Sequence, residues 1–159
     1  MTETSKIKLF ISDVDGTLTD GGMYYTANGE IMKKFNTRDA VGLRLLQEHN
    51  ITIALITGED SDIVRSRANK LNIELVYCGI TDKVAVLKQL CTELNIKPQQ
   101  VAYVGDDIND FEIMQNVGLS FAVSDAESLI LNVATIKLTK SGGAGAVREA
   151  ANYLLENII

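Results

Sequence analysis

Short apolar runs alternate with segments of helical periodicity along most of this chain, and this alternation constrains the fold more than any other feature. Each run has the length of a buried strand and is followed by a turn or polar residue. The expected strands cover residues 7–12, 51–58, 73–77, 101–105, 119–123 and 135–138. The expected helices cover residues 39–48, 60–71, 82–94, 108–117 and 127–132, and a last helix follows residues 142–145. Such alternation predicts a parallel sheet with helices on both faces, joined by right-handed crossovers. We therefore predict an α/β fold, a doubly wound, Rossmann-like domain of three layers.

The length and composition predict one such domain over residues 1–159. Hydrophobic residues make up 46% of the chain and charged residues 23%, which suits a globular domain with a sizeable core. A small hairpin is expected at about residues 21–36, because Asn28-Gly29 is a strong turn signal between two short apolar stretches. A lone hairpin is marginally stable. We expect its apolar side chains either to fold onto their own domain or to contact another subunit.

The charge and the cysteines exclude several classes of protein. The net charge of −6 disfavours a nucleic acid or an anionic membrane as partner. No apolar run approaches the roughly 20 residues that a membrane helix needs, and the first residues lack a signal-peptide pattern. Cys78 and Cys91 have neither disulfide-framework nor zinc-site spacing, so they are expected to be reduced thiols. These features predict a cytoplasmic protein with no membrane partner.

Polar residues of a particular kind stand at the ends of the expected strands. Asp13 and Asp15 follow the first strand, Thr57 ends the second, and Asp106 follows the fourth, while Lys83 begins the helix after the third. The carboxyl ends of parallel strands meet at one edge of a sheet, so we expect these groups to lie close together. Each alone has an ordinary explanation, such as a helix cap or a surface charge. Their occurrence together, in this order, is specific.

The residue types suit phosphoryl transfer, which needs positioning and charge neutralisation above all. Asp13 is the expected nucleophile and would form an aspartyl-phosphate. Asp15 would protonate the leaving alcohol and later take a proton from the hydrolytic water. Thr57 and Lys83 would hold the phosphoryl oxygens, the lysine as a point charge.

Carboxylates gathered at a buried strand end are costly unless a cation pairs them, and Mg2+ suits hard oxygen ligands. The expected ligands are Asp13, the backbone carbonyl of Asp15, and Asp106, with the ion bridging carboxylate and phosphate. Asp107 and Asp110 would lie behind these ligands and hold them in orientation. The sequence therefore predicts a magnesium site at the same edge of the sheet.

These motifs resemble those of the haloacid dehalogenase superfamily of phosphatases, and the resemblance covers essentially the whole chain. The motifs are Asp13-Val14-Asp15-Gly16-Thr17, Thr57, Lys83 and Gly105-Asp106-Asp107-Ile108-Asn109-Asp110. Many such enzymes carry an inserted cap domain, for which this chain has no room. It looks most like the capless branch that dephosphorylates 2-keto-3-deoxy sugar acids. This resemblance implies a phosphatase for a small phosphorylated sugar acid, and a homotetramer whose neighbouring subunits complete each site.

The resemblance also bears on the length of the sugar acid. In the branch that acts on 3-deoxy-D-manno-octulosonate 8-phosphate, an arginine usually follows the Thr/Ser-Gly of the second strand, whereas Glu59 stands here. Glu59 together with Arg67 and Lys70 is more similar to phosphatases of nine-carbon, sialic-acid-type 9-phosphates. We therefore expect a nine-carbon substrate, with the eight-carbon acid as the alternative. The expected substrate-binding residues are Thr37, Arg38, Asp39, Glu59, Arg67, Lys70 and Asn109.

Arg67 and Lys70 are three residues apart and share a helix face. Arg67 lies about eight residues past the strand end, or roughly 12 Å along a helix, and is poorly placed for its own Asp13. We expect both cations to reach a neighbouring subunit's site and bind the substrate carboxylate.

A protein of another class could also gather carboxylates, a hydroxyl and a lysine at strand ends. A response-regulator receiver accepts phosphate on an aspartate but serves as a switch without turnover. The second acid two residues after the first favours an enzyme, because Asp15 can then act as acid and base. Steady Mg2+-dependent phosphate release would identify a phosphatase, and a lasting aspartyl-phosphate would identify a switch.

Overall fold

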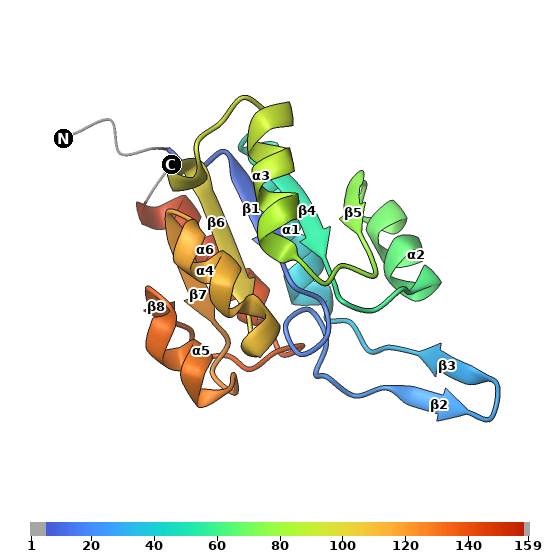
Figure 1. The fold of residues 1–159 in the computed structure, drawn as a ribbon. Coiled ribbons are helices and arrows are strands. Elements are labelled where there is room, and N and C mark those ends of the chain that lie inside the picture. Colours follow the sequence, from blue (N-terminus) through green and yellow to red (C-terminus); the bar gives the residue numbers. More distant parts are fainter. Residues whose placement is uncertain (1–5, 158–159) are drawn as a thin grey trace.

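A computed structural model describes residues 6–157, and its centre is a six-stranded sheet (Figure 1). The strands are β1 (Leu9–Ser12), β4 (Thr52–Ile56), β5 (Leu75–Tyr77), β6 (Val101–Gly105), β7 (Leu119–Ala122) and β8 (Ile136–Lys137). They lie in the order β5-β4-β1-β6-β7-β8, and every pairing is parallel. Ser12 at the end of β1 lies between Leu55 and Val104 of the two flanking strands. The predicted doubly wound α/β fold is confirmed.

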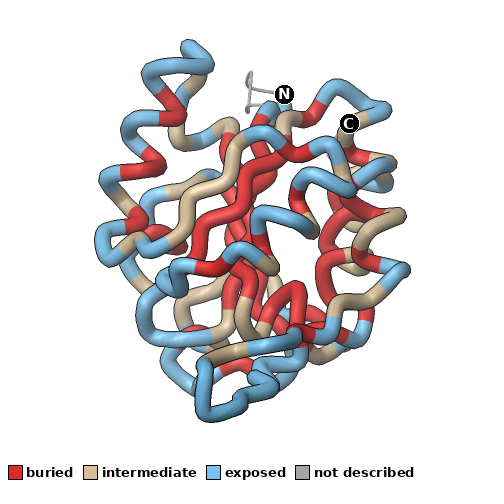
Figure 2. The backbone as a smooth tube through the Cα atoms, turned by 90° about the vertical axis from the view of Figure 1, so that its right-hand side faces the viewer, coloured by how far each residue is buried: buried red, intermediate tan, exposed pale blue. Residues whose placement is uncertain are grey.

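Helices cover both faces of the sheet. They are α1 (Thr37–Glu48), α2 (Asp62–Lys70), α3 (Lys83–Glu93), α4 (Phe111–Asn116), α5 (Ser128–Val133) and α6 (Ala146–Asn157), with short 3-10 turns at Pro98–Gln100 and Ile108–Asp110. Helices α1 and α6 pack against each other on one face, and α3 packs beside α4 on the other (Figure 1). Buried residues run along the central strands β1, β4, β6 and β7, while exposed residues occupy the loops and the outer helix faces (Figure 2).

The helix starts are set by capping side chains. Asn36 accepts a hydrogen bond from the backbone N–H of Arg38 at 2.8 Å, so α1 begins two residues before the predicted start. Ser61 caps α2, and Asp82 caps α3 through the N–H of Ala85 at 2.9 Å. The cap at Asp82 makes Lys83 the first residue of α3, directly beside the sheet edge.

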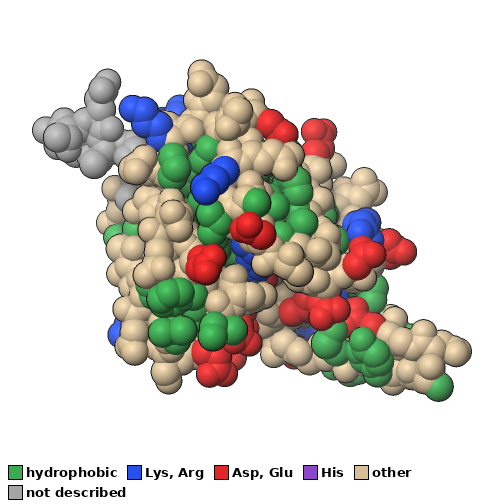
Figure 3. All heavy atoms as spheres, in the orientation of Figure 1, with side chains coloured by type: hydrophobic (Ala, Val, Ile, Leu, Met, Phe, Trp, Pro, Cys, Tyr) green, Lys and Arg blue, Asp and Glu red, His purple; other side chains and the backbone are tan. Residues whose placement is uncertain are grey.

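The expected hairpin is present as β2 (Tyr24–Thr26) and β3 (Gly29–Met32), an antiparallel pair that projects away from the sheet (Figure 1). Its apolar side chains are not covered by the rest of the described chain: Tyr25 is 64% exposed and Ile31 59%. Apolar side chains are visible on its surface in Figure 3. This exposure contradicts the first of the two alternatives, packing of these side chains onto their own domain, and contact with another subunit stays a prediction. Within residues 6–157, no helix has the length and apolarity to cross a bilayer.

Candidate active site

The predicted catalytic carboxylates share a cavity at the carboxyl edge of the sheet, where the strand order reverses between β1 and β6. Ligands of open α/β sheets bind at such reversal points. The cavity has a volume of about 230 Å3. It is lined by Asp13, Asp15, Thr57, Gly58, Glu59, Asp106, Asp107, Ile108 and Asn109. These residues all belong to the loops that follow β1, β4 and β6, which are neighbouring strands.

A buried lysine lies against the predicted nucleophile. The ammonium of Lys83 donates to Asp13 Oδ1 at 2.7 Å, to Asp110 Oδ1 at 2.8 Å and to the hydroxyl oxygen of Tyr103 at 3.1 Å. The Tyr103 hydroxyl in turn donates to Asp110. Burial alone would lower the pKa of Lys83, but Asp13 and Asp110 more than offset this and raise it. Lys83 is therefore charged at neutral pH and neutralises part of the acidic cluster.

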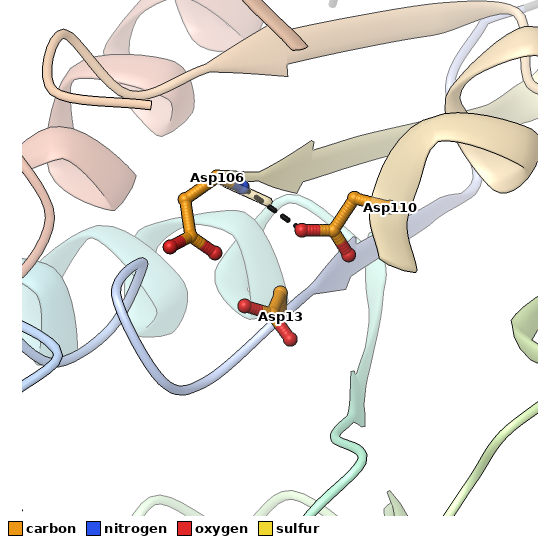
Figure 4. Close-up of side chains that lie close together, drawn as sticks. All are labelled: Asp13, Asp106 and Asp110. Carbon is orange, nitrogen blue, oxygen red and sulfur yellow. Dashed lines mark hydrogen bonds between the residues drawn. The ribbon is translucent and has the colours of Figure 1, made fainter. Parts of the chain in front are cut away.

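The carboxylates of Asp13 and Asp106 lie close together and repel each other (Figure 4). Burial, and then the charge of Asp110, hold the pKa of Asp13 well above its usual range, although Lys83 opposes the shift. Burial is also the main cause that raises the pKa of Asp106 to about 6. The hydroxyl of Thr17 lies 3.3 Å from both Asp13 Oδ2 and Asp106 Oδ1, and one hydroxyl proton cannot serve both. Within residues 6–157, the ion pair of Asp13 with Lys83 is the only one that either carboxylate forms.

This geometry fits a hard divalent cation. Oxygens of Asp13, Asp106 and Asp110 lie within 4.8 Å of one another, and Mg2+ prefers carboxylate oxygens. Gly16 allows the loop after β1 to lie close to the Asp106 carboxylate, because a Cβ at this position would lie 2.0 Å from Asp106 Oδ2. Gly16 also has a φ of +85°, which disfavours any other residue.

Asp110 differs from the other two carboxylates because both of its oxygens are already used. Oδ1 accepts from Lys83 and Tyr103, and Oδ2 accepts from the backbone N–H of Asp106 at 2.9 Å and of Asp107 at 3.2 Å. These bonds replace the first turn of the expected 108–117 helix by a 3-10 turn, so that α4 begins only at Phe111. Asp107 caps this turn through the N–H of Ile108. Asp13 and Asp106 thus have the oxygens that would hold the ion, and Asp110 orients the loop.

The predicted acid/base, Asp15, is held from the hairpin side. Lys33, which follows β3, donates to Asp15 Oδ1 at 2.5 Å and to Glu30 at 3.0 Å. The other oxygen of Asp15 accepts from the Thr57 hydroxyl at 3.3 Å. Burial lowers the pKa of Lys33, but its bonds to Asp15 and Glu30 outweigh this and raise it.

The expected substrate-binding residues are only partly brought together. Glu59 and Asn109 line the cavity. Arg67 and Lys70 do not: the Arg67 guanidinium stacks on the Phe35 ring at 5.4 Å, and Lys70 is exposed at the end of α2. The buried Nε of Arg67 has no hydrogen-bond partner within residues 6–157.

The three residues at the start of α1 lie apart from the cavity. Thr37 and Arg38 are exposed, and Arg38 lines a separate hollow of about 440 Å3 beside α6. Asp39 is 1% exposed, and its carboxylate accepts from the backbone N–H of Arg148 at 2.9 Å. Burial raises the pKa of Asp39 against the opposing backbone bonds of α6. Asp39 therefore holds the start of α6 in the described chain, and its expected role in substrate binding stays a prediction.

Sequence reasoning missed Lys33 and Tyr103. Tyr103 reads as a core residue of a buried strand, and only the fold places its hydroxyl between Lys83 and Asp110. Lys33 stands beside Lys34 in a polar stretch, where a lysine is ordinarily a surface residue. The sequence offers one signal, the spacing of three residues between Glu30 and Lys33, which suits an ion pair between them but does not point to Asp15.

Comparison with known proteins agrees with this geometry. Residues 62–150 match the model of the haloacid dehalogenase-like hydrolases. The 3-deoxy-D-manno-octulosonate 8-phosphate phosphatase KdsC of Salmonella typhi is 44% identical over 155 residues, covering 98% of this chain and 82% of the relative. This chain belongs to the haloacid dehalogenase-like hydrolases.

Solved structures of other haloacid dehalogenase-like hydrolases superpose closely. The 3-deoxy-D-manno-octulosonate 8-phosphate phosphatase from Yersinia pestis has a TM-score of 0.93 and 42% identity, covering 96% of this chain and 83% of that one. The same enzyme from Moraxella catarrhalis was solved with magnesium, phosphate and KDO; it has a TM-score of 0.92, 37% identity, and coverage of 96% and 88%.

The family and the phosphatase relatives together indicate a phosphoric monoester hydrolase, which disfavours the receiver alternative. The predicted use of Mg2+ by this haloacid dehalogenase-like hydrolase is confirmed by the family and by its carboxylate cluster together. The predicted resemblance to the capless branch is confirmed as well.

Proposed function

We propose that the protein hydrolyses 3-deoxy-D-manno-octulosonate 8-phosphate to the free sugar acid and inorganic phosphate. The observation that carries the chemistry is the pairing of the buried Asp13 with Lys83 at 2.7 Å, in a cavity shared with Asp15. The relatives support this choice of substrate, since the similar proteins of Salmonella typhi and Yersinia pestis are named 3-deoxy-D-manno-octulosonate 8-phosphate phosphatases.

The reaction proceeds in two displacements. A carboxylate oxygen of Asp13 attacks phosphorus, the bond from phosphorus to the sugar oxygen breaks, and Asp15 protonates the departing alkoxide. Water then gives a proton to Asp15 and attacks the aspartyl-phosphate, which releases phosphate and regenerates Asp13. Lys83 and the Thr57 hydroxyl hold phosphoryl oxygens during both steps. Mg2+ on Asp13, Asp106 and the Asp15 carbonyl would supply charge neutralisation for the phosphoryl group.

A second candidate substrate is a nine-carbon 2-keto-3-deoxy acid 9-phosphate. The observation in its favour is Glu59, which lines the cavity where the resemblance places an arginine in eight-carbon enzymes. The relatives named above are eight-carbon phosphatases, so the eight-carbon acid is the first choice.

The test is kcat/KM for phosphate release from the eight-carbon 8-phosphate and from nine-carbon 9-phosphates, with and without an amide at C5. We expect the eight-carbon acid to be preferred. A tenfold preference for a nine-carbon acid would refute this choice. If Glu59 contributes to the choice of substrate, Glu59→Arg should raise kcat/KM for the eight-carbon acid relative to the nine-carbon acids. Glu74→Arg, the same change at an exposed site outside the cavity, should leave this relative preference unaltered.

We also propose that the protein assembles as a homotetramer through the hairpin. The exposed apolar side chains of β2 and β3 support this assembly, since large apolar patches mark partner surfaces. Tyr25→Asp together with Ile31→Asp should lower the mass measured by sedimentation.

In such an assembly, Arg67 and Lys70 would serve a neighbouring subunit's site and bind the substrate carboxylate. Lys70→Glu should therefore raise KM for the sugar acid and leave KM for a small generic phosphate ester unchanged.

A further inference from the structure

We propose that Lys33 is a positioning residue that fixes which oxygen of Asp15 transfers the proton. This inference rests on the proposed phosphatase chemistry at Asp15 and concerns a residue outside the four motifs. Lys33 follows β3, 18 residues after Asp15, and reaches the site from the hairpin.

The burial of Lys33 shows that its position is specified. Its side chain has no exposed surface, whereas that of the adjacent Lys34 is 66% exposed and lies 4.0 Å from Asp20. A buried ammonium is costly unless it is paired and hydrogen-bonded. Lys33 meets this need with two carboxylates, those of Asp15 at 2.5 Å and Glu30 at 3.0 Å. Glu30 therefore holds the ammonium, and the ammonium holds Asp15.

The two oxygens of Asp15 have different neighbours. Oδ1 accepts from Lys33, and an ammonium can only donate, so a proton on Oδ1 would have no acceptor on that side. Oδ2 lies 3.3 Å from the Thr57 hydroxyl, which can both donate and accept. Asp15 and Thr57 line the same cavity. Oδ2 is therefore the oxygen with a neighbour that can accept a proton, and we assign to it the proton that goes to the leaving sugar and the one later taken from water.

Lys33 also joins the hairpin to the catalytic acid. Glu30 belongs to β3, Asp15 to the loop after β1, and the ammonium of Lys33 bridges them. Within the described chain, loss of the ammonium leaves the 3.3 Å bond from Thr57 as the remaining side-chain hydrogen bond of Asp15, whose side chain is 24% exposed, so that either oxygen can carry the proton. Phosphoryl transfer to a leaving group that needs no proton should not be affected by this freedom.

The experiment uses two esters and Lys33→Met, a change that keeps most of the side-chain volume. One ester is the sugar-acid phosphate, whose alkoxide must be protonated as it leaves; the other is p-nitrophenyl phosphate, whose phenolate leaves without a proton. The ratio kcat/KM reports the steps through release of this first product. We expect kcat/KM of Lys33→Met to fall roughly 10- to 100-fold on the sugar phosphate, part of the 10²–10⁴ that a general acid contributes. On p-nitrophenyl phosphate it should stay within about twofold, with a burst of nitrophenolate because hydrolysis of the aspartyl-phosphate still needs Asp15.

Lys34→Met is the matched control and should leave both ratios unchanged. Glu30→Gln weakens the hold on Lys33 without removing it, and should give the same selective loss at a smaller size. If Lys33→Met melts at a lower temperature than the wild type, Glu30→Gln is used for the test in its place. Equal loss on both esters, or no loss on either, would overturn the proposal. Wild-type protein that hydrolyses a different alkyl phosphate but no sugar-acid phosphate would refute only the proposed substrate, and that alkyl phosphate then serves for the test.

Discussion

The acidic cluster that suits the active site for a metal should destabilise the metal-free protein. Burial is the main cause that raises the pKa of Asp106 from 3.8 to about 6. This is roughly 2 pKa units, and each is worth about 1.4 kcal/mol, so charging Asp106 costs the folded state about 3 kcal/mol. Asp106→Asn removes that charge. We therefore expect Asp106→Asn to raise the free energy of unfolding of metal-free protein by up to about 3 kcal/mol at pH 7.

The sign of the pH dependence follows from the same shift. Between pH 3.8 and about 6 the folded state keeps the Asp106 proton that the unfolded state has lost. The free energy of unfolding of metal-free wild-type protein should therefore fall as the pH rises through that window. In Asp106→Asn this part of the fall should be absent, because the variant has no carboxyl at position 106.

Urea unfolding in excess chelator and in excess Mg2+, at pH 5 and pH 7, measures both effects. Mg2+ should stabilise the wild type at pH 7 and stabilise Asp106→Asn much less, because a ligand of the folded state adds to its stability. Glu74→Gln, which removes a carboxylate charge at an exposed position outside the cavity, is the control. If Asp106→Asn were less stable than the wild type in chelator at pH 7, the argument from charge repulsion would be refuted.

Three further changes test single contacts. Gly16→Ala places a methyl group 2.0 Å from Asp106 Oδ2, so the Mg2+ concentration for half-maximal activity should rise at least tenfold. Tyr103→Phe removes the hydroxyl between Lys83 and Asp110 and should cost about 1 kcal/mol in urea unfolding and several-fold in kcat; unchanged kcat would show that this bond does not position Lys83. Asp39→Ala removes the acceptor at the start of α6 and should lower the free energy of unfolding by about 1–2 kcal/mol with KM unchanged. A higher KM at full stability would instead support a role of Asp39 in substrate binding.

The order of strands and helices was readable from the sequence because it depends on local periodicity. The apolar runs ending at Asp13, Thr57 and Asp106 became β1, β4 and β6, and the parallel topology alone brought their polar ends to one edge. The helix starts at Ser61 and Asp82 were equally local, since each cap acts within three residues. The candidate site could be predicted for the same reason.

Contacts between distant segments were not readable. Asp39 has the pattern of a polar helix start, yet it is buried against α6, 109 residues away at Arg148. Lys33 has the pattern of a surface lysine, yet the exit of the hairpin carries it to Asp15. Periodicity says whether a side chain faces a core, but which charge it meets depends on how whole elements pack, and for these residues only the folded chain could decide it.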